Sequence, residues 1–333
     1  MTRNSNLTTA KRLKNDEFYT QIQDIQAELQ HYEEQFAEKE ILCNCNDGES
    51  SGFWIYLSKN FERLKLKKLT CISYSTDAPA YSLEIRNETS RIQKKALQGN
   101  GDFRNPESIA FLENSDIVIT NPPFSIFREY FSLLMQYHKK FLIVGSLNAV
   151  TYKEVFPHLK IDEISLGINQ IKGFIQKNDT VRTFGNIVWY TNMKSVRPHK
   201  RMILKKNYSP LNYPDYDNLS AIEVGKVSDI PADYYGVMGV PVSFLTKYSP
   251  EQFELIGLTS LGQSIDSSLC IRKYKNVFQH GADGKISNGS KTNTSAVIRV
   301  RDKPTGTYYT ADNVEGYLIS KFVRVLIKRR EYH

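Results

Sequence analysis

The sequence predicts an α/β fold in which helices cover both faces of a largely parallel sheet. Continuous apolar runs at 41–45, 116–120 and 140–146 have the length and composition of strands that are buried on both sides. Segments with helical spacing of apolar residues separate them, most clearly at 21–40. Strands that alternate with amphipathic helices are typical of parallel sheets with crossover helices.

The first part of the chain is predicted as a regular series of such elements. An amphipathic helix at 21–40 would place Ile22, Ile25, Leu29, Tyr32 and Phe36 on one face. The elements expected after it are strand 41–45, helix 52–64, strands 69–75 and 116–120, helix 126–137, and strands 140–146, 163–167 and 183–190.

The pattern changes near residue 195, where we place a domain boundary between 1–195 and 196–333. Residues 196–248 are rich in Pro, Tyr and Asn with weak periodicity, which predicts loops. Ser249-Pro250-Glu251-Gln252 combines a capping serine with proline in the first turn and predicts the start of a helix. Strands at 295–301, 307–311 and 317–328 would form a β-meander.

Composition excludes several classes of protein. The 333 residues are 40% hydrophobic, too apolar for a disordered chain. No apolar run reaches the roughly 18 residues of a membrane span, and the first residues lack the apolar core of a secretory signal. The four cysteines have no paired spacing, which fits a reducing cytosol and no disulfide framework. We expect a cytoplasmic protein without a membrane partner.

The charge balance is positive. Lys and Arg number 44 against 36 Asp and Glu, a net charge of +8, and basic residues gather at 199–206 and 321–330. Twenty tyrosines and seventeen phenylalanines lie along the same chain. Basic stripes with interleaved aromatics suit nucleic acid, although solvated faces of ordinary elements explain the charge alone equally well.

The segment 116–124 (DIVITNPPF) carries the clearest chemical signal. Two prolines after a buried strand fix the backbone and remove two N–H donors. The Asn121 side-chain oxygen and the Pro122 carbonyl can then both accept from one amino group, and Phe124 can stack on a base. The loops 44–52 and 99–106 would lie at the same end of the sheet, where parallel sheets bind ligands. The alternative, a proline-ended turn with a core aromatic, is the weaker reading in this strand–loop–helix context.

With NPPF, the chain resembles amino-methyltransferases that use S-adenosylmethionine, whose motif IV is (D/N/S)PP(Y/F/W). It resembles more narrowly the EcoRI family of adenine-specific DNA methyltransferases, and the likeness covers most of the chain. The segments that carry it, in order, are DEFYTQ (16–21), ILCNCND (41–47), NGDFRN (100–105), TNPPF (120–124), FLIVGSLNA (141–149), RTFGNIVWYTN (182–192), VMGVPVSFLTKYSPEQFELIG (237–257) and VLIKRR (325–330).

The resemblance implies a Rossmann-like S-adenosylmethionine-dependent methyltransferase sheet over 1–195 and a smaller, mixed α+β target-recognition region over 196–333. It implies a site-specific adenine N6-methyltransferase that acts on a flipped base in duplex DNA. The catalytic residues would be Asn121, Pro122, Pro123 and Phe124. Residues implied at the cofactor are Phe18, Tyr19, Thr20, Asn44, Asn46, Asp47, Asp102, Phe103 and Asn121. Phe184 and Trp189 match the region that walls the target base, although Trp189 fits a core position at least as well.

One departure from the family pattern concerns the loop after the first sheet strand. The usual glycine-rich turn is replaced by Cys43-Asn44-Cys45-Asn46-Asp47-Gly48. Glycine allows a backbone to approach a ligand closely, so assignments within this loop are open, as is the ribose ligand after the second strand.

Several alternatives remain at the level of sequence. The acceptor could be cytosine N4, RNA adenine or protein glutamine, or the chain could be a non-catalytic DNA-binding protein with a decayed cofactor site. A metal is not expected, because no His or Cys pair has ligand spacing. A monomer is plausible, and the sequence identifies neither a recognition sequence nor a restriction partner. The basic residues expected at DNA phosphates are Lys200, Arg201, Lys205, Lys206, Lys328, Arg329 and Arg330.

Overall fold

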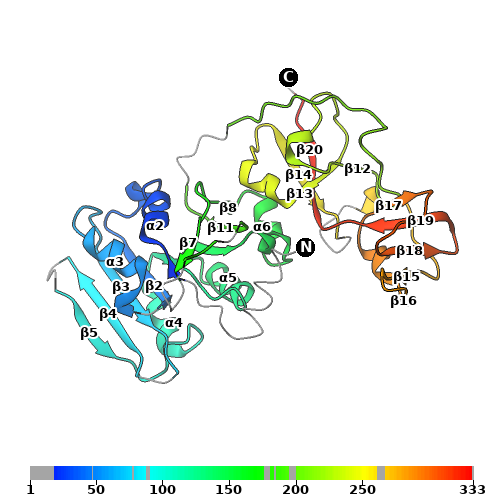
Figure 1. Ribbon diagram of the computed structural model, residues 1–333. Coiled ribbons are helices and arrows are strands. Elements are labelled where there is room, and N and C mark those ends of the chain that lie inside the picture. Colours follow the sequence, from blue (N-terminus) through cyan, green and yellow to red (C-terminus); the bar gives the residue numbers. More distant parts are fainter. Residues whose placement is uncertain are drawn as a thin grey trace. The chain divides into compact units, whose positions relative to one another are not determined.

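The chain folds into two compact units, residues 1–197 and 198–333 (Figure 1). The structure is a computed structural model that describes residues 19–46, 48–76, 79–87, 91–175, 181–183, 185–194, 200–260 and 267–331. Within the described residues, no helix has the length and apolar character needed to span a membrane.

The first unit is built on an eight-stranded sheet with the order β5-β4-β3-β2-β6-β7-β11-β8. The strands β3, β2, β6 and β7 are parallel, whereas β4 and β5 on one side and β11 on the other pair antiparallel. The bounds are β2 (Glu40–Asn46), β3 (Lys68–Ser73), β4 (Tyr81–Arg86), β5 (Gln93–Ala96), β6 (Ile117–Thr120), β7 (Lys140–Ser146), β8 (Ser165–Leu166) and β11 (Ile187–Thr191). The predicted parallel centre is therefore confirmed within a mixed sheet.

Helices cover both faces of this sheet (Figure 1). Leu142 and Val144 of β7 belong to the core formed with α2 (Ile22–Leu29) and α3 (Gly52–Lys59). The opposite face of β7 meets α5 (Phe127–Gln136), because Phe131 stacks edge-on against Phe141 and Gly145 lies under the Phe127 ring. The remaining helices are α4 (Pro106–Glu113) and α6 (Phe156–Lys160).

The predicted helix 21–40 is shorter than its apolar pattern suggests. α2 ends at Leu29, after which His31 and Tyr32 donate to carbonyls three residues back, as in a 3₁₀ turn. The buried face is nevertheless as predicted for Leu29, Tyr32 and Phe36, all at most 1% exposed, whereas Ile22 is exposed. The pattern thus predicted burial correctly at every position but Ile22, and it predicted the helix length wrongly.

A small three-stranded sheet flanks the end of the parallel strands where the loops predicted to bind ligands lie. Its order is β1-β9-β10, with β1 (Tyr19–Thr20), β9 (Phe174–Ile175) and β10 (Val181–Arg182). Thr20 pairs with Phe174, which connects the start of the described chain to residues more than 150 positions away.

The second unit contains two sheets. A four-stranded sheet has the order β12-β13-β20-β14 and a five-stranded sheet the order β16-β15-β18-β19-β17. The bounds are β12 (Ile222–Glu223), β13 (Met238–Pro241), β14 (Phe253–Leu258), β15 (Phe278–His280), β16 (Ile286–Asn288), β17 (Val297–Val300), β18 (Tyr308–Ala311), β19 (Val314–Ser320) and β20 (Arg324–Arg329).

Two predictions for this unit are wrong. Ser249 does not start a helix: its carbonyl accepts from Gln252 and Phe253, and the turn leads into β14. The period-two burial of Phe253 and Leu255 explains why a strand follows. The predicted strand 317–328 is divided into β19 and β20, which belong to different sheets, and β19 lies between β18 and β17, so the strands do not form a simple meander. The helical turns described in this unit are 3₁₀ turns.

One short segment joins the two sheets of the second unit. Tyr216 donates to Glu223 of β12, which also binds Arg324 of β20. The next residue, Asp217, binds Arg299 of β17 at 3.2 Å. Asn218 is fully buried and accepts from the Val297 N–H at 3.0 Å. Tyr216 thus anchors the segment in the four-stranded sheet, and Asp217 and Asn218 anchor it in the five-stranded sheet.

Candidate active site

The site lies where the parallel strands β2 and β6 end side by side. The Thr120 hydroxyl at the end of β6 donates to the Asn44 carbonyl of β2, and the Tyr130 hydroxyl of α5 donates to the Asn44 side-chain oxygen. All three residues are buried, and burial raises the pKa of Tyr130. Asn44 therefore locks the two strand ends to α5.

The end of β2 departs from regular strand geometry at Cys45. Cys45 has φ +58°, the left-handed region that side chains rarely occupy, and the pairing of β2 with β3 shifts register between Cys43 and Asn46. Gly48 has φ +59° and lies against the Tyr81 hydroxyl. Burial, with the neighbouring Asp102 carboxylate, raises the pKa of the Cys45 thiol, so this cysteine stays a neutral thiol near pH 7.

The loop 99–105 folds onto the end of β3. Ser75 donates to the Asn100 carbonyl at 3.0 Å, and the Asn100 side chain accepts from the Asp102 N–H at 3.1 Å. The Asp102 carboxylate is held by the Arg104 guanidinium, with N···O distances of 2.6 and 2.8 Å. These hydrogen bonds lower the pKa of Asp102, which therefore remains an acceptor at neutral pH. Phe103 is buried edge-on against Tyr130.

Gly101 permits the close approach of this loop. Its φ is +78°, and a Cβ there would lie 1.9 Å from the Ser73 carbonyl oxygen. We expect Gly101→Ala to displace the loop and with it Asp102, lowering stability by about 1–3 kcal/mol. Because the family resemblance implies that Asp102 binds the cofactor, we also expect cofactor binding to weaken at least tenfold. Isothermal titration with S-adenosylmethionine measures the second effect. The exposed, unhindered Gly225→Ala is the matched control, and unchanged affinity in Gly101→Ala would show that the loop does not contact the cofactor.

The NPPF segment forms a tight turn between β6 and α5. Pro122 is buried, while Asn121, Pro123 and Phe124 are partly exposed. The Pro123 carbonyl accepts from the Ile126 N–H at 3.1 Å. The Phe124 ring meets Phe174 of β9 edge-on, with ring centroids 6.2 Å apart.

Contacts through Phe174 also bring Thr20 to this edge. Phe174 pairs with Thr20. The Thr20 carbonyl oxygen lies close to Gly52, the first residue of α3, since a Cβ added to Gly52 would be 2.8 Å from that oxygen. The hydroxyls of Thr20 and of Ser51, just before α3, are buried and have no hydrogen-bond partner among the described residues. Two orphaned hydroxyls beside a helix N-terminus indicate a site for a polar ligand group.

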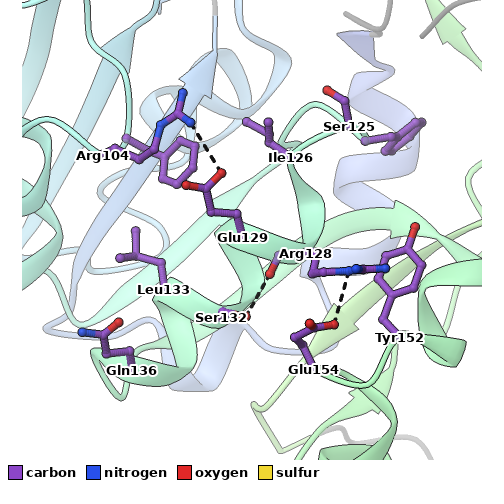
Figure 2. Close-up of a pocket in the computed structure, with 12 residues that line it drawn as sticks. Arg104, Ser125, Ile126, Arg128, Glu129, Ser132, Leu133, Gln136, Tyr152 and Glu154 are labelled. Atoms are coloured by element: carbon purple, nitrogen blue, oxygen red, sulfur yellow. Dashed lines mark hydrogen bonds and ion pairs between the residues drawn. The ribbon is translucent and has the colours of Figure 1, made fainter. Parts of the chain in front are cut away.

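An open cavity of about 760 Å³ adjoins the NPPF turn (Figure 2). Phe103, Ile126 and Leu133 supply apolar walls. Its charged rim contains two ion pairs, Arg104 with Glu129 and Arg128 with Glu154. The Arg128 guanidinium also lies 4.4 Å from the centre of the Tyr152 ring.

The structure brings some predicted site residues together and leaves others undetermined. The residues that lie at one end of the sheet, in strand ends and in loops, are Thr20, Asn44, Asp102, Phe103, Asn121, Pro122, Pro123 and Phe124. Phe18, Asp47 and Phe184 lie outside the described residues, as do the side chains of Tyr19 and Asn46. Trp189 is fully buried and packs edge-on against Phe53, so it is part of the core.

Sequence reasoning missed three residues of this site. Tyr130 follows the helical spacing of core positions in α5, which hides its role. Arg104 stands two residues after Asp102, a spacing that could have signalled the ion pair. Ser51 gave no signal, because only the fold places it beside Thr20.

The predicted DNA-contacting residues belong to the second unit. Lys200, Arg201, Lys205, Lys206, Lys328 and Arg330 are exposed, and Arg329 is partly buried with its guanidinium 4.7 Å from the Tyr235 ring centre. Gln252 connects the two basic segments, since its side chain bonds the Met202 backbone at 2.7 and 2.9 Å and its carbonyl accepts from the Arg330 N–H at 3.0 Å. In the described part of the chain, no group of His, Cys, Asp and Glu residues has the arrangement of a metal site.

Comparison with known proteins identifies related sequences. The family described as adenine-specific methyltransferase EcoRI matches residues 6–330. The chain is 42% identical over 289 residues to the type II methyltransferase M.EcoRI of Escherichia coli, covering 76% of this chain and 89% of the relative. It is 35% identical over 313 residues to the type II methyltransferase M.MpnI of Mycoplasma pneumoniae, covering 88% and 97%. No solved structure matches the chain significantly.

Proposed function

The chain belongs to the EcoRI family of adenine-specific methyltransferases, and we propose that it methylates N6 of an adenine in duplex DNA with S-adenosylmethionine as the methyl donor. The observation that carries the proposal is the convergence of the NPPF turn, the Asp102 loop and Thr20 at one end of the sheet. We assign cofactor binding and catalysis to the first unit and DNA recognition to the second.

The residues at this edge suit the cofactor. The orphaned hydroxyls of Thr20 and Ser51, beside the N-terminus of α3, would hold its amino-acid end. The ionised Asp102 carboxylate has lone pairs left for the amino group of the cofactor's adenine, and the apolar walls of the adjoining cavity would cover that ring. Because the Asn44 side chain is buried, we assign it the role of positioning the strand ends.

The NPPF turn would hold the target base. Adenine N6 carries two N–H groups, which the Asn121 side-chain oxygen and the Pro122 carbonyl can accept together. Phe124, fixed against Phe174, would stack on a base rotated out of the duplex, which costs a few kcal/mol of lost stacking and pairing.

The cofactor supplies an electrophilic methyl group on a sulfonium. The chain's own residues orient the amino group so that the N6 lone pair points at that methyl. As the new N–C bond forms, the methyl–sulfur bond would break with a neutral thioether as the leaving group, and the proton then leaves N6 for water. No side chain needs to act as a strong base, and proximity and orientation supply most of the rate enhancement.

Nucleoside mass spectrometry tests the reaction directly. The purified protein is incubated with unmethylated DNA and S-adenosylmethionine, and the DNA is digested to nucleosides. We expect N6-methyldeoxyadenosine only when both protein and cofactor are present. Detection of methylcytosine, or of methylation only on added RNA or protein, would show that the acceptor is not DNA adenine. If no methyl group is transferred to any of these acceptors, the proposal of an enzyme is contradicted.

Phosphate contacts by the basic residues of the second unit predict salt-dependent DNA binding. Each phosphate contact contributes about 0.9 to the slope of log K against log salt. We expect Lys205→Ala/Lys206→Ala to lower this slope by about two and to weaken binding to all sequences equally. Fluorescence anisotropy at several salt concentrations measures it, with Lys59→Ala, an exposed lysine of α3, as the control. An unchanged slope would mean that Lys205 and Lys206 contact solvent and not DNA phosphates.

A further inference from the structure

The edge hairpin of the five-stranded sheet exposes an unusual set of side chains. Strands β15 and β16 pair antiparallel with Phe278 opposite Asn288, so these two side chains share a face. Phe278 is 49% exposed and Ile286 64%, and all of β16 is exposed. An open groove of about 820 Å³ runs along this hairpin.

The groove is lined by amide and hydroxyl groups, and its floor is rigid. Asn276, Ser287, Asn288 and Ser290 line it. Beneath them, Tyr274 and Val277 belong to the buried core. A Cβ on Gly289 would lie 2.7 Å from the Val277 side chain, so the segment after β16 is packed tightly onto β15.

The side-chain amides of the groove differ in how many of their hydrogen-bonding atoms already have a partner within the protein. Both ends of the Asn293 side chain bind the Tyr274 backbone, at 2.8 and 3.0 Å, so that residue is structural. Asn288 uses only its side-chain oxygen, which accepts from the Ser290 N–H at 2.8 Å. Its amino group has no hydrogen-bond partner among the described residues, and the bond to Ser290 holds the side chain in place.

The surroundings of the groove are strongly basic. Between residues 267 and 300 the sequence has six cations and a single acid, Asp283. The six, all exposed, are Arg272, Lys273, Lys275, Lys285, Lys291 and Arg299. Asp217, which binds Arg272 and Arg299, and Asp312, which binds Asn276, still leave an excess of positive charge.

We propose that the β15–β16 hairpin enters the major groove of duplex DNA and that Asn288 reads a base edge there. The major groove admits a two-stranded ribbon, and side-chain amides are suited to hydrogen-bond base edges in it. The surrounding lysines would bind phosphates, which position the hairpin without reading sequence. Exposed Phe278 and Ile286 offer apolar contacts to a thymine methyl group. This inference rests on the proposed function, because it takes DNA as the substrate.

Two variants at Asn288 distinguish a role in base recognition from a purely structural role. Asn288→Asp keeps the oxygen that accepts from Ser290 but replaces the amino donor with an acceptor, and Asn288→Ala removes both. Methylation of a DNA library with randomised sequence around adenine, followed by sequencing of the methylated sites, gives the preferred context of each protein. Asn87→Ala, an exposed asparagine of the first unit, is the control.

We expect both Asn288 variants to lose discrimination at one base pair by about 10- to 100-fold, while the total rate on the library changes little. The control should keep the wild-type context. If active Asn288 variants keep that context as well, the inference is wrong although the proposed function stands. If the wild type leaves all DNA unmethylated, the proposed function fails and this inference with it.

Discussion

Asn121→Ala is expected to lower kcat for DNA methylation by about 1,000-fold, the loss typical of removing one positioned polar group from a reacting centre. The variant loses the side-chain oxygen that we propose accepts from adenine N6. The adjoining prolines still fix the turn, so the dissociation constants for DNA and cofactor should stay within about threefold. Single-turnover kinetics and anisotropy measure these quantities separately.

Two further variants sharpen this test. Asn121→Asp keeps an acceptor oxygen and should retain intermediate activity. Asn114→Ala, an exposed residue that caps α4, should match the wild type. If Asn121→Ala turns over normally, or loses activity only in proportion to weaker DNA binding, Asn121 is not a catalytic residue.

Glu223→Ala is expected to destabilise the second unit by about 3–5 kcal/mol, the cost of breaking a buried ion pair. Its carboxylate is 6% exposed and binds Arg324 at 2.7 Å, while the Tyr216 hydroxyl donates to the other oxygen. Alanine leaves a nearly buried guanidinium without its counter-ion and a buried hydroxyl without its acceptor. Urea unfolding followed by circular dichroism measures the loss.

The positions of the tryptophans provide an internal reference for that experiment. Trp54 and Trp189 are the two tryptophans of the chain and both belong to the first unit, so fluorescence follows that unit alone. Glu254→Ala, an exposed residue of β14, should cost less than about 1 kcal/mol. A loss below 1 kcal/mol for Glu223→Ala would contradict the expectation and would mean that Arg324 finds another partner.

Short sequence patterns predicted the elements whose burial is visible within a few consecutive residues. The apolar runs located β2, β6 and β7 because strands buried on both faces need apolar side chains throughout. β5 was missed because its residues Gln93–Ala96 are fully exposed and carry no such pattern. The helix predicted at Ser249 shows the converse, a capping signal that the alternating burial of β14 overrides.

The candidate site was predictable only in its motifs. NPPF could be named because its residue types indicate its chemistry, whereas Asp102 was named only because the chain resembles a known family. The contact of Gly101 with Ser73 and the bond of Tyr130 to Asn44 join residues far apart in sequence, and no local pattern encodes such contacts. Cys45 in a left-handed conformation was equally hidden, because that conformation normally selects glycine.

The segment Tyr216–Asp217–Asn218 has a consequence for the mechanics of the second unit. Since its side chains are anchored in both sheets, neither sheet can melt without breaking the other's contacts, and the two should unfold in one cooperative step. The β15–β16 hairpin belongs to the five-stranded sheet, so it cannot pivot freely against the four-stranded sheet. Force applied to β15 and β16 by a bound duplex would therefore be carried to β20 as a displacement of the whole unit.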